Sequence, residues 1–135
     1  MNIDRASYEL GIIASFAEVV ALGVKKLALS SPLAPDMYES IKEHAGRIVL
    51  ENGIKSYIEK DLLVTDLFSE DIAKDKYVIM LYAADSTLES YLSLKDNKRQ
   101  LVESGGWTGE ARKVIAREFG RLLSYPEEKI EEILS

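Results

Sequence analysis

Three basic residues recur at every fourth position near the C-terminal end: Lys113, Arg117 and Arg121. On a helix this spacing places all three side chains on one face, one turn apart. Guanidinium groups bind phosphate and carboxylate through paired hydrogen bonds. The chain has a net charge of −6, yet residues 95–121 hold seven basic and four acidic residues. This basic stripe (Lys113, Arg117 and Arg121) is therefore a candidate anion-binding surface. The alternative is a solvated helix face, or one paired with acids of a neighbouring helix or a second subunit.

A second polar group follows an uncharged run, residues 77–83, which is typical of a buried strand. Asp85, Ser86 and Thr87 come directly after it, at the predicted start of a helix, where free N–H groups favour anions. The pair Ser30-Ser31 closes an earlier predicted strand in the same way. Ligands bind beyond the carboxyl ends of parallel strands in open sheets. Ser86 and Thr87 thus join the basic stripe as candidate anion-binding residues. The alternative is that Ser86 only caps its helix.

Other polar groups have simpler interpretations. The Gly-rich segment 105–110 lacks the Lys-Ser/Thr pair of a nucleotide loop, so we predict a helix-to-helix turn capped by Thr108. His44 has no second His with which to share a metal ion. Six acids near the second predicted strand do not have EF-hand spacing: Glu59, Asp61, Asp66, Glu70, Asp71 and Asp75. We predict no metal site, and the sequence identifies neither a catalytic residue nor a cofactor.

Composition excludes several kinds of chemistry. The chain has no Cys and one His in 135 residues, which excludes disulfides, thiol catalysis and thiolate metal sites. It carries no phosphate-loop or Gly-x-Ser-x-Gly motif. The acidic balance argues against nucleic acid or anionic membranes as partners. The longest apolar stretch, residues 10–22, is too short to span a membrane. The lack of Cys favours the cytoplasm, and 30% charged residues with a single Gln is a thermophile-like composition.

Hydrophobic periodicity and turn signals predict the element order α-β-α-β-β-α-α-α. In the first helix, residues 4–22, Tyr8 stands on the apolar face and Glu9 on the polar face. Pro35 opens a second helix that runs to about residue 51. Strands are expected at residues 24–29, from residue 55, and at 77–83, the last as a central strand. Later helices are expected from residue 86 to about 103, from about 110, and from about 126. The patterns Ser86-x-x-Glu89 and Ser124-x-x-Glu127 predict capping boxes, and Ser69 is predicted to cap a short turn.

The fold class predicted from this order is α/β, with α+β as the alternative. Gly23-Val24-Lys25 recurs thirty residues later as Gly53-Ile54-Lys55, which fits a β-α-β unit. We expect one compact domain over residues 1–135, with a three-stranded, partly parallel sheet covered by helices. The first helix is apolar over a wider arc than a small sheet needs. Part of it, or of the C-terminal helices, is therefore predicted to form a homodimer interface.

The segment from Phe119 to Glu127 reads Phe-Gly-Arg-Leu-Leu-Ser-Tyr-Pro-Glu. It resembles a segment of a family of small uncharacterised prokaryotic proteins, mostly archaeal, that reads Gly-Arg-Leu-Leu-Gly-Tyr-Pro. Ser124 replaces the second Gly of that segment. The family has no assigned activity, so the resemblance implies no functional residue.

Two functions are open at this point. The favoured interpretation is a non-catalytic binding or interaction module, with a small anionic molecule as candidate ligand. The alternative is an enzyme that acts on a phosphorylated or carboxylated small molecule through Arg117, Arg121 and the turn at residues 85–87. An enzyme requires an acid or base directed into the same cleft as the basic stripe.

Overall fold

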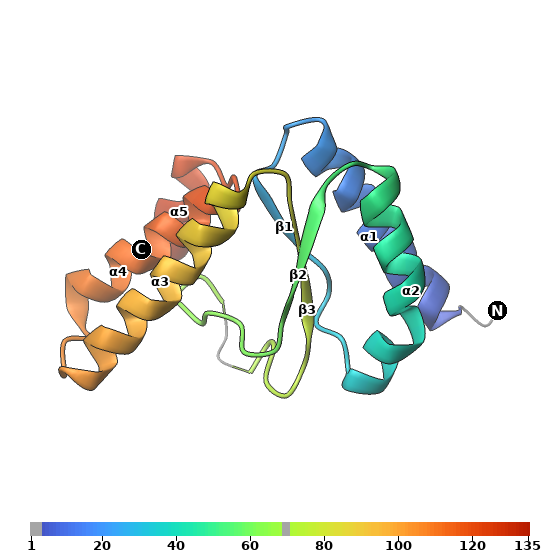
Figure 1. Cartoon of the computed structure of the whole chain (residues 1–135). Helices are drawn as coiled ribbons and strands as arrows, with labels where there is room; N and C mark the ends of the chain where they lie inside the picture. The colour runs from blue at the N-terminus through green and yellow to red at the C-terminus, as the bar shows by residue number, and fades with distance from the viewer. Residues whose placement is uncertain (1–3, 69–70) are drawn as a thin grey trace.

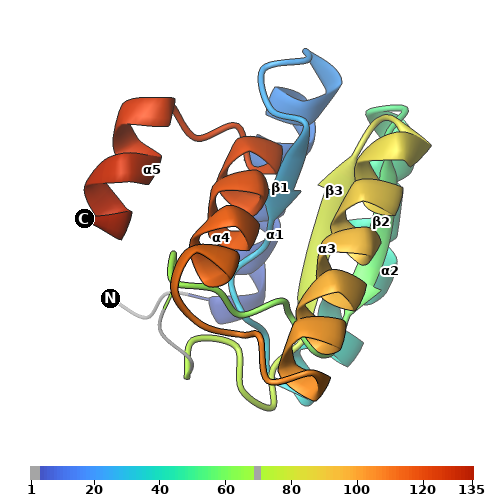
Figure 2. The same cartoon turned by 90° about the vertical axis from the view of Figure 1, so that its left-hand side faces the viewer.

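A computed structural model describes residues 4–68 and 71–135. Within these residues the chain forms five helices and three strands. In chain order they are α1 (Arg5–Ala21), β1 (Leu27–Leu29), α2 (Pro35–Glu51), β2 (Lys55–Glu59), β3 (Val78–Tyr82), α3 (Asp85–Glu103), α4 (Gly109–Leu122) and α5 (Glu127–Leu134). The strands form one sheet between two layers of helices (Figure 1). Helices α1 and α2 cover one face, and α3 and α4 cover the other, with α5 packed on α4 (Figure 2).

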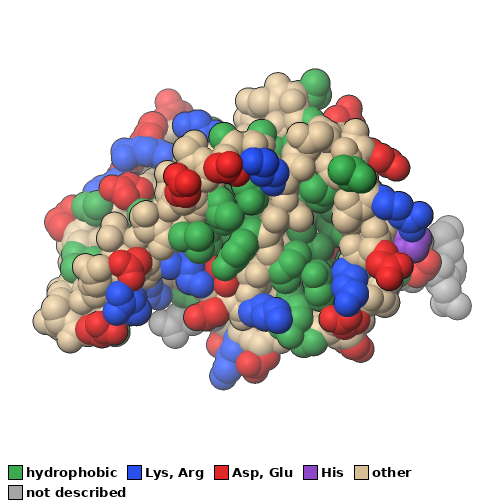
Figure 3. Space-filling view, in the orientation of Figure 1, with side chains coloured by type: hydrophobic (Ala, Val, Ile, Leu, Met, Phe, Trp, Pro, Cys, Tyr) green, Lys and Arg blue, Asp and Glu red, His purple; other side chains and the backbone are tan. Residues whose placement is uncertain are grey.

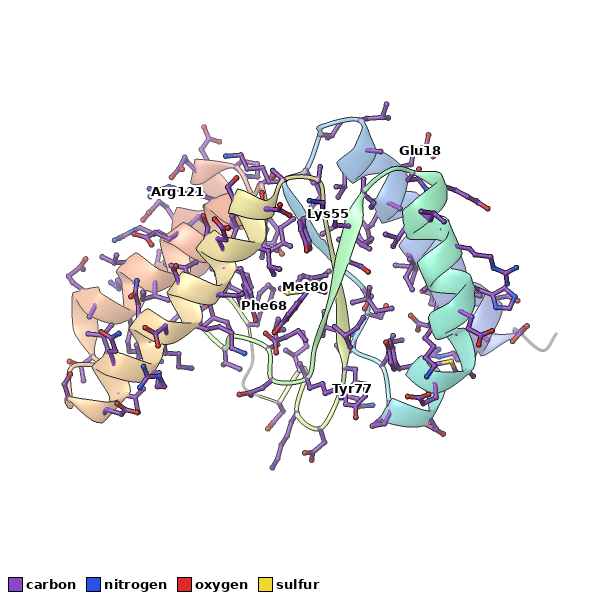
Figure 4. The ribbon with its side chains drawn as sticks, in the orientation of Figure 1. Glu18, Lys55, Phe68, Tyr77, Met80 and Arg121 are labelled. Atoms are coloured by element: carbon purple, nitrogen blue, oxygen red, sulfur yellow. The ribbon has the colours of Figure 1, made fainter. Side chains whose placement is uncertain are left out.

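The strand β3 is the centre of the sheet, whose order is β1-β3-β2. Its residues from Val78 to Leu81 are at most 2% exposed. This confirms the central strand predicted from the uncharged run. Alternate side chains point to opposite faces, since Met80 packs in the core beneath α3 and α4 while Ile79 and Leu81 pack beneath α1 and α2. Figure 4 shows Met80 on the side of the sheet that faces α3 and α4.

The prediction of a partly parallel sheet is wrong, because both pairings, β1 with β3 and β2 with β3, are antiparallel. The three-stranded sheet with helices on both faces belongs to the α+β class that was the stated alternative. The physical reason is the position of β3. Strands β1 and β2 run in the same direction, as expected of strands joined through α2, but β3 lies between them and pairs with both. The carboxyl ends of β1 and β3 therefore lie at opposite ends of the sheet.

Helix α1 shows a second difference from the sequence prediction. Glu9, expected on the polar face, is only 4% exposed, and Tyr8, expected on the apolar face, is 52% exposed. The buried face runs through Glu9, Ile13, Ala17 and Val20. The neighbouring side chains of Leu10 and Phe16 also pack against the core formed with α2 and the sheet. Most of the wide apolar arc is thus used within the molecule.

The predicted capping boxes do not form. Helix α3 begins one residue earlier than expected, with Ala84 as its N-cap, so Ser86 lies inside the first turn. Helix α5 begins after Pro126, and Ser124 belongs instead to the end of α4. Thr108 is the N-cap of α4, but its side chain makes no capping hydrogen bond. The turn predicted at Ser69 lies outside the described residues. The first strand covers only the last three of the six residues expected.

Candidate functional site

The basic stripe lies on α4, but acids from the same chain already bind two of its members. Arg117 Nε donates to Glu131 of α5 (2.8 Å), and Arg121 binds both carboxylate oxygens of Glu127 (2.7 and 3.2 Å). The hydrogen bond to Glu131 raises the pKa of Arg117, and that to Glu127 raises the pKa of Arg121. The same contact lowers the pKa of Glu127. The neighbouring-helix alternative therefore accounts for these two arginines without a ligand.

The structure brings only part of the predicted anion site together. Ser86 and Arg121 line one polar hollow of about 520 Å³ between α3 and α4, together with Lys26 and two acids, Glu89 and Glu118. Among the described residues, Lys113, Arg117 and Thr87 do not belong to its lining, and Thr87 is 7% exposed. The hollow therefore contains two cations and two carboxylates, which gives it no net charge. Arg121 lies on the side of α4 away from the sheet (Figure 4).

A buried charged cluster that the sequence did not reveal joins β2 to α3. Glu59, 3% exposed, accepts hydrogen bonds from the Tyr91 hydroxyl (2.7 Å), the Lys95 ammonium (2.9 Å) and the backbone N–H of Asp61 (2.9 Å). Tyr91 also accepts a bond from the N–H of Leu63 (3.0 Å), and its burial raises its pKa. Every member has a partner within the chain. This cluster therefore positions the segment after β2 on α3, and a buried carboxylate held this way is a structural group.

Lys25 stands at the rim of an apolar pocket beside β1. Its Nζ lies 5.7 Å from the ring centre of Phe16 and 5.6 Å from that of Tyr125. The pocket has a volume of about 200 Å³. Its apolar lining comes from α1, β1, the segment after β1, the segment after β2, β3 and the turn after α4: Phe16, Leu29, Pro32, Leu62, Phe68, Ile72, Val78, Leu123 and Tyr125. Phe68 lies between the sheet and the α3–α4 layer (Figure 4).

Lys25 has no counter-charge among the residues that the structure describes. In residues 4–68 and 71–135 no carboxylate forms an ion pair with it. Two aromatic faces attract its ammonium group, while burial lowers its pKa from the ordinary value of 10.5. A cation that is partly desolvated and unpaired is an unusual neighbour for an apolar pocket, because desolvation without a partner is unfavourable.

Ser30, another polar side chain in the lining of this pocket, already has hydrogen-bond partners. Ser30 accepts a hydrogen bond from the N–H of Ile79 (2.9 Å), and its hydroxyl donates to the carbonyl of Ser31 (2.9 Å). The Ser30 hydroxyl thus takes the place of a backbone carbonyl in the hydrogen bonding between the end of β1 and β3. It is therefore not free to act as a nucleophile. The strand-end Ser30-Ser31 that the sequence singled out is therefore structural, although it lies at the edge of the pocket.

The sequence did not single out Lys25 as a functional residue. The hydrophobic pattern predicts Lys25 to be part of a strand that begins at Val24, but Val24 is 68% exposed and precedes β1. Phe16 and Tyr125, the rings that flank Lys25, are more than a hundred positions apart in the sequence. Only the packing of the turn after α4 against the end of α1 brings them together. No local pattern could have found this arrangement.

In the described parts of the chain, no three carboxylate or His side chains gather as a metal site would require. Within the same residues no helix has the length and apolar character needed to cross a membrane. Comparison of the chain with protein-family models, with curated proteins and with solved structures finds no match. The resemblance of residues 119–127 to small prokaryotic proteins stays a prediction. A functional proposal therefore rests on the geometry of this chain alone.

Proposed function

We propose that this protein is a binding module for a small apolar molecule that carries a carboxylate, such as an arylacetic or short fatty acid. The apolar part would occupy the pocket beside β1, and the carboxylate would pair with Lys25. The observation that carries the proposal is the unpaired ammonium of Lys25, held between Phe16 and Tyr125 at the rim of an otherwise apolar pocket. A carboxylate there supplies a counter-charge that residues 4–68 and 71–135 do not supply.

The size of the pocket limits the ligand. A protein cavity of about 150 Å³ holds one benzene molecule, so about 200 Å³ suits a single ring or a chain of similar volume. A ligand of roughly ten non-hydrogen atoms binds with a dissociation constant on the order of 0.1–1 mM. The proposal deepens the favoured interpretation from the sequence, a non-catalytic module for a small anionic ligand.

The alternative, an enzyme that uses the basic stripe, has less support. Arg117 and Arg121 already bind Glu131 and Glu127, and the hollow that Arg121 shares with Ser86 contains as many carboxylates as cations. A phosphorylated substrate would have to displace these acids. Glu89 and Glu118 do supply acids in that hollow, so the alternative stays a prediction that the control variant below also tests.

The first experiment is a calorimetric titration with phenylacetate and with its neutral amide, phenylacetamide. We expect saturable binding of phenylacetate, at least about tenfold weaker binding of the amide, and a similar loss for the Lys25→Met variant, since tenfold corresponds to about 1.4 kcal/mol for the ion pair. Lys26→Met is the matched control, because Lys26 is exposed and lines the polar hollow instead. Equal binding by the parent and Lys25→Met contradicts the proposal. If only Lys26→Met loses binding, the ligand binds in the α3–α4 hollow instead of the pocket beside β1.

The pH dependence of binding gives a second test. A carboxylate pairs with the ammonium form, and burial lowers the pKa of Lys25 from 10.5 in the free protein. The free protein therefore loses the binding-competent charge at a lower pH than an exposed lysine would. We expect the affinity for phenylacetate to be constant near neutral pH. Once the pH exceeds the pKa of Lys25, the affinity is expected to fall by up to tenfold per pH unit. A flat profile up to pH 10.5 would show that Lys25 does not hold the carboxylate.

A further inference from the structure

The two edges of the sheet differ in how well they are covered. Beyond β1 lie the apolar pocket and its walls, and the N–H of Lys26 donates to the hydroxyl of Ser124 in the turn after α4 (3.1 Å). Beyond β2, Figures 1 and 2 show no helix or strand of the described chain. An open edge offers backbone N–H and C=O groups to any strand that can pair with them.

Strand β2 lacks two of the features by which proteins protect an open edge. Its five residues include no proline, and all five pair with β3 in unbroken register, so no bulge distorts the edge. Its three middle residues, Ser56, Tyr57 and Ile58, carry no charge. The charged residues Lys55 and Glu59 stand at its two ends.

The surface on both sides of this edge is partly apolar. On the α2 side, Ile58 lines a hollow of about 180 Å³ together with Tyr38 and Val49. On the α3 side, Leu92 is 38% exposed. Figure 3 looks onto this face and shows hydrophobic side chains gathered between α3 and α2. A strand added at the edge would cover part of this surface.

We propose that β2 of a second copy of this chain covers the edge, so that two antiparallel β2 strands join two sheets into one of six strands. The charges of β2 select this occupant and this direction. In an antiparallel pair centred on Tyr57, Lys55 of each copy lies opposite the partner's Glu59, on the same face of the sheet. A parallel pair in register would place Lys55 beside the partner's Lys55, which is unfavourable.

The carboxylate of Glu59 is 3% exposed and already accepts three hydrogen bonds in the chain, from Tyr91, Lys95 and the backbone of Asp61. The partner's Lys55 would therefore add a charge beside this group without replacing Lys95, and a carboxylate has about four acceptor sites. Lys55 binds Asp85 in an exposed pair, which costs little to exchange for a pair with another carboxylate. The homodimer expected from the sequence is thus assigned to β2 in place of α1 or the C-terminal helices. This interface lies at the edge opposite the Lys25 pocket, so it does not depend on the proposed ligand.

Sedimentation velocity between 1 and 100 μM tests this interface. We expect the parent to approach twice the monomer mass of 15.1 kDa as concentration rises. The exposed positions Ser56 and Lys55 allow variants that keep the fold: Ser56→Lys puts a charge in the middle of the edge, and Lys55→Glu opposes the partner's Glu59. Both variants are expected to sediment as monomers, while Lys26→Glu, at the other edge, behaves as the parent does.

A monomeric parent overturns the proposal, and an extended peptide of another protein is then the candidate occupant. A dimer unchanged in both β2 variants overturns it as well, because another surface then holds the copies together.

The register has its own test, because the natural chain contains no Cys. Tyr57→Cys places a thiol on the proposed two-fold axis, where the two Cα atoms of a directly opposed pair lie within disulfide range. We expect this variant to form a covalent dimer under mild oxidation. Lys26→Cys, also a single surface thiol, is the control and is expected to form no covalent dimer under the same conditions. Equal cross-linking of the two variants overturns the assigned register.

Discussion

Ser124 occupies a backbone conformation that three other helix ends in this protein give to glycine. After α4 the N–H of Ser124 bonds to the carbonyl of Arg121, and that of Tyr125 to the carbonyl of Gly120. The same pair of bonds ends α1, α2 and α3, where the corresponding residues are Gly23, Gly53 and Gly105. Ser124 has φ 63°, in the left-handed region, which costs a non-glycine residue about 1–2 kcal/mol. Its hydroxyl offsets part of that cost by accepting a bond from Lys26.

Two substitutions at this position separate the strain from the hydrogen bond. Ser124→Ala keeps the left-handed conformation and loses the bond, so we expect the free energy of unfolding to fall by about 0.5–1.5 kcal/mol. Ser124→Gly loses the same bond but relieves the strain. Its free energy of unfolding is therefore expected to be about 1 kcal/mol higher than that of Ser124→Ala. Urea unfolding followed by circular dichroism measures both values. Two variants of equal stability would show that Ser124 is not strained.

At the scale of elements, Gly120 permits the close contact between α4 and α5. A Cβ atom at this position would lie 2.8 Å from the side chain of Ile130, which is completely buried, and 3.4 Å from that of Leu67. Real Cβ atoms do not approach other atoms to 2.8 Å, so the buried side chain of Ile130 would have to shift. Gly46 of α2 is the matched position, because a Cβ atom there would meet nothing within 4 Å.

The two glycines are therefore expected to respond in opposite directions to alanine. Gly46→Ala should raise the free energy of unfolding by up to about 1 kcal/mol, since alanine is the better helix former. Gly120→Ala should lower the free energy of unfolding by roughly 1–3 kcal/mol. Alanine brings the same gain in helix propensity here, but the cost of overpacking against Ile130 is larger than that gain. Thermal unfolding of both variants measures the difference. A stabilised Gly120→Ala variant would mean that α5 does not pack on α4 as described.

The sequence predicts elements here better than it predicts their pairing. The uncharged run around Ile79 specifies a buried central strand, and Pro35 fixes the start of α2, because both signals are local. The partners of β3 depend on the path of the chain between residues 60 and 77, whose sequence carries no hairpin signal. For the same reason the periodicity of Arg117 and Arg121 is visible in the sequence, whereas their acids on α5 and the rings around Lys25 are not. Those contacts follow from how whole elements pack.

At the scale of the whole molecule, β3 belongs to two hydrophobic cores at once. Ile79 packs with Ile13 and Ile41 beneath α1 and α2, whereas its neighbour Met80 packs with Phe119 and Tyr91 beneath α3 and α4. The single tryptophan, Trp107, packs against the second core only. Because the two cores share a strand, damage to either core is expected to weaken both layers together.

We expect Ile79→Ala and Met80→Ala to unfold in one cooperative transition each, destabilised by about 2–5 kcal/mol as for other buried residues shortened to alanine. The informative measurement is Trp107 fluorescence in Ile79→Ala, since the substitution is on the face of the sheet opposite the tryptophan. If the chain is one cooperative domain, the urea midpoints from fluorescence and from far-ultraviolet circular dichroism shift equally in both variants. Met80→Ala serves as the matched control, because its cavity opens on the same side as Trp107.

A fluorescence midpoint that stays at the parent value in Ile79→Ala while the dichroism midpoint falls would show that the two helical layers unfold independently. The sheet would then support two separately stable halves, contrary to the single compact domain expected from the length of the chain.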